Sequence, residues 1–218
     1  MAQIKNLKKK VVNLKKYFET HWLILILCVA LLIFIQAFIE FSMGRLAICK
    51  CGYVLLWYNN TNGHGNSQHL FDWYSFSHII HGVLFYGILW LFARRLPVKT
   101  RFLLAVLMEC AWEVFENSPF VIDRYRTATF AFDYYGDSII NSVFDVFSMC
   151  LGFILSRKLP VKLTITLVIV LELFTVYMVR DNLTLNFITL IHPIEFVADW
   201  QAAAPNMAPM NLSLFPVG

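Results

Sequence analysis

Charged residues are scarce in this chain of 218 residues: they make up 15% of the sequence, whereas 59% of the residues are hydrophobic. The apolar residues lie in long blocks separated by short charged clusters, while a soluble domain of this size would mix the two kinds. The sequence also lacks internal repeats, a phosphate-cradling glycine loop, a nucleophile elbow and a nucleic-acid-binding module. These absences argue against a soluble domain and disfavour nucleotide and nucleic-acid functions.

Five apolar blocks have the length of a membrane-crossing helix, about 17 to 25 residues. We therefore expect an all-α, polytopic membrane helix bundle. The first block is as uniform as a signal peptide, but no small-residue cleavage site follows it, so we interpret it as a retained anchor. The apolar stretch 183–191 is too short to cross, although a sixth, re-entrant element stays open. The five blocks are 22–41, 75–92, 102–120, 138–155 and 163–179.

Lysine and arginine gather on one side of this expected bundle. Because positive residues stay in the cytoplasm, we expect the N-terminus inside and the C-terminus outside the membrane. The predicted organisation is a basic N-terminus (1–21), a bundle (22–179) with outer loops 42–74 and 117–137, and a partly mobile outer segment (180–218). The N-terminal lysines are a topology signal, or alternatively an anionic-lipid contact. The basic residues on the inner side are Lys5, Lys8, Lys9, Lys10, Lys15, Lys16, Arg94, Arg95, Lys99, Arg101, Arg157, Lys158 and Lys162.

The third block carries three acids, Glu109, Glu113 and Glu116, on a single helical face. A carboxylate at the bilayer centre costs several kcal/mol, so these side chains must face a protein interior or a water-filled cavity. Nearly all the other acids belong to outer loops or to the outer halves of the blocks. We therefore expect any chemistry or binding to open outward.

Polar groups in two other blocks lie at a matching depth. His78 and His81 are adjacent on one face of the second block, and Asn141 and Asp145 lie four residues apart in the fourth. At a rise of about 1.5 Å per residue, His81 and Asp145 each lie about 9 to 10 Å below the outer ends of their helices. Short connections favour antiparallel packing of these three helices, so the sequence predicts that the groups meet.

Three interpretations of this polar cluster stay open. Interhelical hydrogen bonds hold membrane bundles together, but the excess of ionisable groups favours a functional site. A metal site suits imidazole with carboxylate, although the sequence contains neither H-E-x-x-H nor Glu-x-x-His, so the metal and any cofactor stay unknown. Acid and base catalysis is the third, because burial would keep one of Glu109 and Glu113 protonated beside an ionised partner.

Arginines follow the third block directly, at Arg124 and Arg126. Arginine is the usual protein ligand of phosphate oxygens. Together with carboxylates in the outer half of the membrane, these arginines would suit a phosphate-bearing lipid. The alternative is that they pair with the nearby acids Asp123, Asp133 or Asp137.

The first outer loop contains Cys49 and Cys51, followed by His64 and His69. The spacing lies near that of zinc modules, although C-x-C is less usual than C-x-x-C. The oxidising outer face also allows a disulfide between the two cysteines, in a tight ring.

Several short motifs resemble an uncharacterised family of bacterial multi-pass inner-membrane proteins. The match covers nearly all of the chain after the first block and implies a plasma-membrane location. It does not indicate any reaction that the protein catalyses. The motifs are Asn66-Ser67-Gln68-His69-Leu70, Asp72-Trp73-Tyr74, Ser77-His78, His81-Gly82, Ala111-Trp112-Glu113, Glu116-Asn117-Ser118-Pro119, Arg124-Tyr125-Arg126, Gly136-Asp137-Ser138 and Arg180-Asp181-Asn182-Leu183.

A looser resemblance runs to VanZ-like proteins, whose pattern is a glutamate late in one span, an arginine in the next outer loop, then an aspartate and an asparagine. Glu113 or Glu116, Arg124 or Arg126, and then Asp137 and Asn141 fill this pattern. The resemblance implies an envelope role that involves lipid-linked or cell-wall material.

The sequence thus predicts an inner-membrane protein that recognises, or also modifies, a phosphate-bearing envelope lipid. Whether it is an enzyme stays open. The alternative is a non-catalytic subunit or assembly factor of a membrane complex, with a membrane-protein partner; five spans without a repeat disfavour a transporter. The expected catalytic residues are Glu109, Glu113, His81 and Asp145. The expected ligand-binding residues are Arg124, Arg126, Glu116, Asn117, Asp137, Asn141 and His78.

Overall fold

The computed structural model describes residues 22–128 and 134–202, and in this part the chain forms eight helices. Trp57 and Phe71 add one isolated β-bridge, so the fold is all-α. The predictions for 1–21 and for the tail after 202 lie outside the described residues. The helices are α2 (Trp22–Ser42), α3 (Ser75–Ala93), α4 (Val98–Glu116), α5 (Pro119–Ala128), α6 (Ile139–Lys158), α7 (Val161–Val179), α8 (Leu183–Ile191) and α9 (Glu195–Ala202).

Four helices, α2, α3, α6 and α7, are long and apolar enough to cross a membrane. The fifth long helix, α4, has 19 residues but carries five charged side chains. Its range corrects the predicted block 102–120, because the helix begins after Pro97 and ends at Glu116. The predicted outer loop 117–137 also contains a helix, α5, which begins at Pro119 as helices commonly do.

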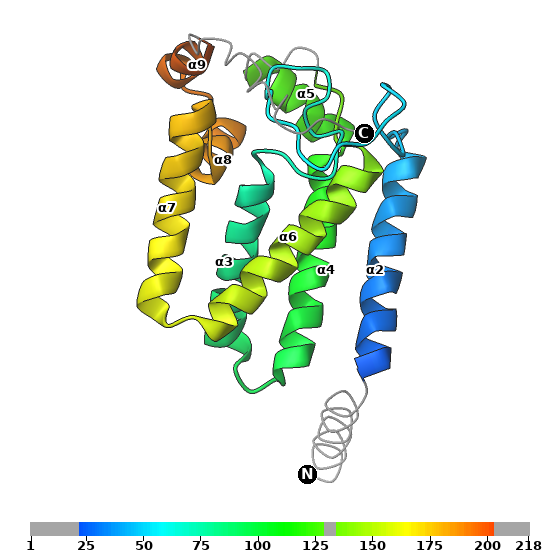
Figure 1. Ribbon diagram of the computed structural model, residues 1–218, viewed down its shortest axis with the longest axis vertical. Helices are drawn as coiled ribbons and strands as arrows, with labels where there is room; N and C mark the ends of the chain where they lie inside the picture. The colour runs from blue at the N-terminus through cyan, green and yellow to red at the C-terminus, as the bar shows by residue number, and fades with distance from the viewer. Residues whose placement is uncertain (1–21, 129–133, 203–218) are drawn as a thin grey trace, which may run out of the picture.

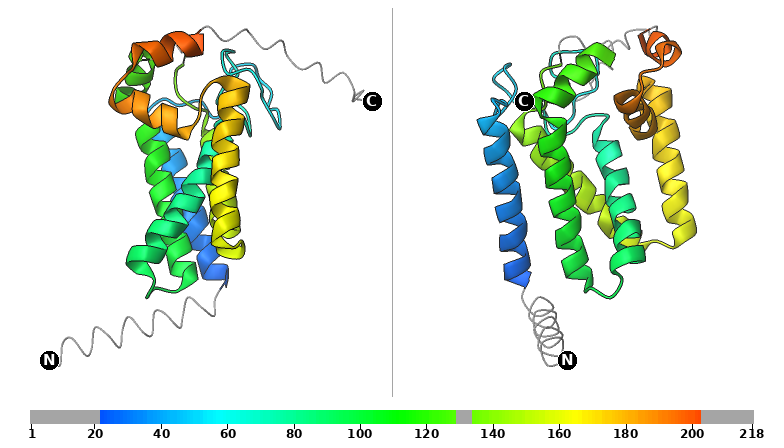
Figure 2. Two further views of the ribbon diagram at one scale, coloured as in Figure 1. Left: turned by 90° about the vertical axis from the view of Figure 1, so that its left-hand side faces the viewer. Right: turned by 180° about the vertical axis from the view of Figure 1, so that it is seen from behind.

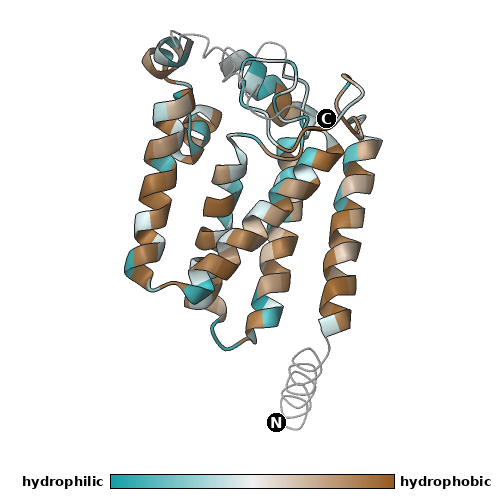
Figure 3. Cartoon of the chain, viewed as in Figure 1, coloured by the Kyte–Doolittle hydropathy of each residue, from teal (hydrophilic) through white to brown (hydrophobic). Residues whose placement is uncertain are grey.

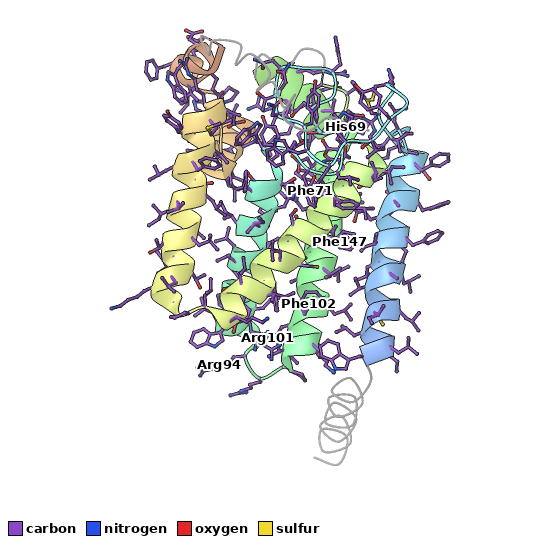
Figure 4. All side chains as sticks on the ribbon, in the orientation of Figure 1. His69, Phe71, Arg94, Arg101, Phe102 and Phe147 are labelled. Carbon is purple, nitrogen blue, oxygen red and sulfur yellow. A yellow bond between two sulfur atoms is a disulfide. The ribbon has the colours of Figure 1, made fainter. Side chains whose placement is uncertain are left out.

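The five long helices run alternately up and down, so the connections gather at two ends (Figure 1). We call the end that carries 43–74, α5, α8 and α9 the loop end, and the end that carries the short turns 94–97 and 159–160 the turn end. Figure 2 shows the same division from the side and from behind. In Figure 4, His69 lies at the loop end, whereas Arg94 and Arg101 lie at the turn end.

The centre of the bundle is formed by α3, α4 and α6. α3 packs most extensively against α6, while α2 packs against α4 and α7 against α3. Gly82 and Gly152 allow the close crossing of α3 and α6: a Cβ on Gly82 would collide with the Met149 carbonyl oxygen, and one on Gly152 with that of Ile79. An apolar core lies beside this crossing and consists of Leu89, Ala105, Val106, Cys110, Val146, Met149 and Phe153.

The flanks of the bundle are apolar. Phe34 on α2 is 67% exposed and Leu173 on α7 is 65% exposed, as expected of surfaces that face lipid. Figure 3 shows that hydrophobic residues cover the middle of the long helices and that hydrophilic residues lie towards both ends of the bundle. The polar side chains of α3, α4 and α6 are instead directed inward, where they form the candidate site.

Candidate functional site

Two histidines from the first turns of α3 face one carboxylate on α4. His78 Nδ1 lies 2.6 Å from Glu109 Oε1, and His81 Nδ1 lies 3.1 Å from Glu109 Oε2. Glu109 has no exposed surface, and both histidines are buried. The i, i+3 spacing on α3 places both imidazoles on the same face, so one carboxylate meets both rings.

Glu113 lies one helical turn beyond Glu109 and is also fully buried. Its Oε1 is 3.2 Å from His78 Nδ1, but neither carboxylate oxygen has a hydrogen-bond partner. The reason is that His78 Nδ1 carries at most one proton, and this nitrogen is closer to Glu109. Glu113 is therefore a buried acceptor without a donor.

Asp145 approaches His78 from α6, on the other side of the ring. His78 Nε2 lies 3.9 Å from Asp145 Oδ2, and the Ser75 hydroxyl donates to Asp145 Oδ1 at 3.1 Å. The three helices therefore bring together the five residues that we call the histidine–carboxylate cluster, with His78 at its centre. The cluster consists of His78, His81, Glu109, Glu113 and Asp145.

A small pocket borders this cluster at the loop end. His78, His81 and Glu116 reach it from within the bundle, and the Trp112 indole N–H donates to Glu116 Oε2 at 2.7 Å. The opposite wall is largely apolar and comes from α8. The lining residues are Tyr74, Ser77, His78, His81, Trp112, Glu116, Tyr125, Leu183, Asn186, Phe187 and Leu190.

Both ends of α8 are held by charged side chains. The Glu172 carboxylate accepts from the backbone N–H groups of Leu183 and Thr184, at 3.1 and 3.2 Å. Arg124 donates to the carbonyl oxygens of Leu190 and Ile191 at the other end, at 3.0 and 3.2 Å. An acid at the N-terminus and a base at the C-terminus of a helix both complement its dipole, so these contacts fix α8 over the pocket.

The two predicted phosphate ligands, Arg124 and Arg126, do not line the pocket. Arg126 donates to the Tyr134 carbonyl oxygen at 2.5 Å and lies 3.6 Å from Asp123. Of the acids proposed as alternative partners, Asp133 lies outside the described residues. Both guanidinium groups therefore bind other parts of the chain.

Three further predicted ligand residues join α4 and α6 to the loops at the loop end. Asn117 donates to Asp137 Oδ2 at 3.0 Å, and its Oδ1 accepts from the Asp137 backbone N–H at 2.7 Å. Asn141 donates to the His69 carbonyl oxygen at 2.9 Å. The neighbours of these residues are thus protein groups, and none of the three lines the pocket.

The carboxyl groups in the loops are shifted towards the neutral form. Burial raises the pKa of Asp72 to about 6 and that of Asp181 to about 7. Burial also raises the pKa of Asp137, against hydrogen bonds from Tyr134 and Asn117. These groups therefore titrate nearer to neutral pH than ordinary carboxyl groups do.

Cys49 and Cys51 form a disulfide, which is one of the two alternatives that the sequence left open. Their sulfur atoms are therefore not thiolate ligands for a zinc module. His69 instead supports the loop, because its Nδ1 accepts from the Leu55 backbone N–H at 3.2 Å and its ring stacks on Tyr53. Burial lowers the pKa of His69, which favours this neutral ring.

Comparison with known proteins places the chain in a family. The family model DUF2585, described as a protein of unknown function, matches residues 40–203. The chain belongs to the DUF2585 family. It is 55% identical over 174 residues to the UPF0314 protein RL4541 of Rhizobium johnstonii (80% of this chain and 89% of the relative). It is 48% identical over 185 residues to a UPF0314 protein of Sphingopyxis alaskensis (84% and 96%).

Membership of the DUF2585 family confirms the resemblance to an uncharacterised bacterial family, and the family's description supplies no reaction. The resemblance to VanZ-like proteins is not shown by these comparisons. No solved structure matches the chain. The function of this DUF2585 protein must therefore be argued from its own residues.

Sequence reasoning missed several residues of the pocket in this DUF2585 protein. It assigned no site role to Trp112, although the i, i+4 spacing to Glu116 could have indicated their contact. Ser77, which shares the histidine face, could have been found in the same way. Asn186, Phe187 and Leu190 carry no such signal, because they come from a distant helix.

Proposed function

We propose that this protein binds the head group of a phosphate-bearing envelope lipid in the pocket beside the histidine–carboxylate cluster and transfers protons to or from it. The observation that carries the proposal is the placement of His78, His81 and Glu116 in the wall of a pocket whose opposite wall, from α8, is largely apolar. A pocket with one polar and one apolar wall suits an amphiphile.

The charge of the pocket determines how such a lipid would lie. Glu116 and the carboxylates behind it repel a phosphate, so a hydroxyl or amine of the head group would contact the polar wall. The phosphate would then lie away from this wall, on the side of Leu190, whose carbonyl oxygen binds Arg124. His81 and Glu116 would be the proton-transferring groups because both reach the pocket.

Native mass spectrometry of the full-length protein, extracted together with its lipids, tests the binding. The wild-type protein should retain one lipid class out of proportion to its share of the membrane. Glu116→Gln should lower this retention about tenfold, because one charge-assisted hydrogen bond is lost. Glu195→Gln is the matched control, since it removes an exposed carboxylate from α9 at the loop end.

Two outcomes would count against the proposal. One is lipid retention that merely follows the membrane composition, and the other is an equal effect of Glu116→Gln and Glu195→Gln. Stable co-purification of a second membrane protein, together with normal function of Glu113→Gln in cells, would instead favour the alternative of a non-catalytic subunit or assembly factor.

The roles of the two arginines can be separated by hydrogen–deuterium exchange. Arg124→Ala should speed exchange in α8 about tenfold, because the helix loses the side chain that binds its last carbonyl groups. Arg126→Ala should leave exchange in α8 unchanged, since Arg126 contacts Tyr134 and Asp123 instead. A purely ligand-binding Arg124 would instead leave exchange in lipid-free protein unaltered.

We further propose that five helices, α4 included, cross the inner membrane with the loop end in the periplasm. The support is the separation of Arg94 and Arg101 from the loop-end residues (Figure 4), because basic residues favour the cytoplasmic side. A membrane-impermeant maleimide applied to intact cells should label Asn62→Cys but label Lys158→Cys only after permeabilisation. The opposite pattern would reverse the orientation.

A further inference from the structure

The histidine–carboxylate cluster contains more acceptors than donors. In residues 22–128 and 134–202, the ion pairs of Glu109, Glu113 and Asp145 are made with histidine alone. Both His78 Nδ1 and His81 Nδ1 face Glu109, which leaves both oxygens of Glu113 without a hydrogen bond. A buried carboxylate that lacks a hydrogen bond is costly, so a further positive charge, from a proton or a cation, would stabilise the site.

Two groups of possible ligand atoms overlap at His78. One ligand atom from each of His78, His81 and Glu109 lies within 4.8 Å of the other two, and the same holds for His78, Glu113 and Glu116. Ligand atoms that surround one ion at bonds of about 2.0 to 2.2 Å lie about 3 to 4 Å apart. The separations of 3.1 Å from His81 to Glu109 and 3.2 Å from His78 to Glu113 fall in this range. The separation of 2.6 Å from His78 to Glu109 is that of a hydrogen bond, and these two atoms would move apart when an ion enters between them.

We propose that His78, His81, Glu109 and Glu113 form a binding site for one divalent transition-metal ion of the zinc, manganese and iron class. Imidazole and carboxylate are the ligands that these ions prefer. The arrangement differs from the di-iron bundle pattern in that one helix supplies both histidines and its neighbour both glutamates. The i, i+3 and i, i+4 spacings keep each pair on one helix face.

Asp145 would orient one of these ligands. His78 presents Nδ1 to the glutamates and Nε2 to Asp145, and Ser75 holds the aspartate in place. A carboxylate on the far nitrogen of a histidine is the usual outer partner of a metal-bound imidazole. His81 and Glu116 connect the site to the pocket, so an ion held here would be reached from the lipid-binding side.

Metal content of the full-length protein tests this proposal, independently of which lipid occupies the pocket. The protein is stripped with a chelator, dialysed against zinc or cobalt, and analysed by mass spectrometry for metal per chain. Wild-type protein should bind about one ion per chain, and the cobalt form should show the visible absorption of a coordinated ion. Glu113→Gln and His81→Asn should each lower the affinity about tenfold to a hundredfold.

Glu40→Gln is the matched control for these variants. Glu40 is also fully buried and lies on α2, where it accepts a hydrogen bond from Gln36 at 3.0 Å. Its substitution should leave the metal content unchanged. Equal loss in Glu40→Gln, or equal binding in Glu113→Gln and His81→Asn, would overturn the assignment.

The wild-type protein alone provides a second measurement if a variant fails to fold. Zinc should raise its thermal unfolding midpoint at micromolar concentrations, whereas magnesium should have no effect, because magnesium avoids imidazole. Absence of both bound metal and thermal stabilisation in wild-type protein would show that protons, shared between the carboxyl groups, neutralise the cluster instead.

Discussion

The two ends of the helices α3, α4 and α6 bury opposite kinds of side chain. Towards the turn end, Val106, Val146 and Met149 have no exposed surface and form an apolar core. Towards the loop end, Glu109 and Glu113 are equally inaccessible but carry ionisable groups. Apolar packing stabilises a bundle, whereas burial of carboxylates costs free energy. Apolar packing near the turn end therefore offsets the free-energy cost of burying carboxylates near the loop end.

This difference predicts that substitutions at the two ends change stability with opposite sign. A smaller residue in the apolar core leaves a cavity, whereas a neutral residue in the cluster removes an uncompensated charge. Substitutions at the crossing of α3 and α6, in the apolar core and in the cluster test this contrast.

Gly152→Ala should have the largest effect. Its new Cβ would meet the backbone carbonyl of Ile79, which cannot move aside as a side chain can. We expect a loss of about 3 kcal/mol or more and poor accumulation in membranes. Gly87→Ala is the control, because nothing lies within 4 Å of its added Cβ. Unfolding midpoints of the two purified variants would show the contrast, and similar midpoints would mean that α3 and α6 do not cross so closely.

Met149→Ala should destabilise the protein by about 2 to 4 kcal/mol, because the side chain is fully buried and leaves a cavity. Phe147→Ala, in the same helix, removes a side chain that is 46% exposed and should cost much less. Denaturant unfolding in mixed micelles measures both. Equal losses would indicate that lipid-facing packing contributes as much as the core.

Glu113→Gln should stabilise the protein when metal is absent, whereas the core substitutions destabilise it. In chelator-treated protein we expect an increase in the free energy of unfolding of about 1 kcal/mol, since the amide removes an unpartnered carboxylate. With zinc present the order should reverse, because the wild-type protein gains the binding energy. A variant less stable than wild type in both conditions would place Glu113 among purely structural residues.

Asp181 should give the smallest effect, visible as a dependence on pH. Its pKa is raised by burial to about 7 in the folded protein, above the ordinary value of about 3.9 in the unfolded chain. The folded state therefore holds this proton more tightly, and the associated stability is fully present below pH 4 and is lost as the pH rises through about 7. The unfolding midpoint should fall less between pH 6 and 8 in Asp181→Asn than in wild type.

Hydrophobic runs in the sequence predicted the helices because lipid-facing and core-facing segments are both apolar. α3, α7 and α8 begin within two residues of the predicted segments 75–92, 163–179 and 183–191. The start of α4 was missed because Lys99 and Arg101 interrupt its apolar pattern. The helix includes them nonetheless, and Arg101 lies over the ring of Tyr86 at 5.6 Å.

Convergence of the histidines and acids could also be expected, since spacing along a helix fixes which side chains share a face. The position of α8 could not, because it depends on contacts between distant parts of the chain. Arg124 and its acceptor in Leu190 are 66 residues apart, and nothing in either local sequence indicates the contact. For the same reason the sequence could not show that Arg124 binds backbone carbonyl groups.

The close approach of Gly82 and Gly152 has a consequence for synthesis of the protein. When α3 leaves the ribosome, the helix that fits against its glycine has not yet been made. If α4 crosses the membrane, as we propose, it would enter with its acids before Asp145 is available. During this interval the imidazoles and carboxylates are without their final surroundings. We therefore expect insertion of this chain to require that α3 and α4 stay shielded from lipid until α6 is made.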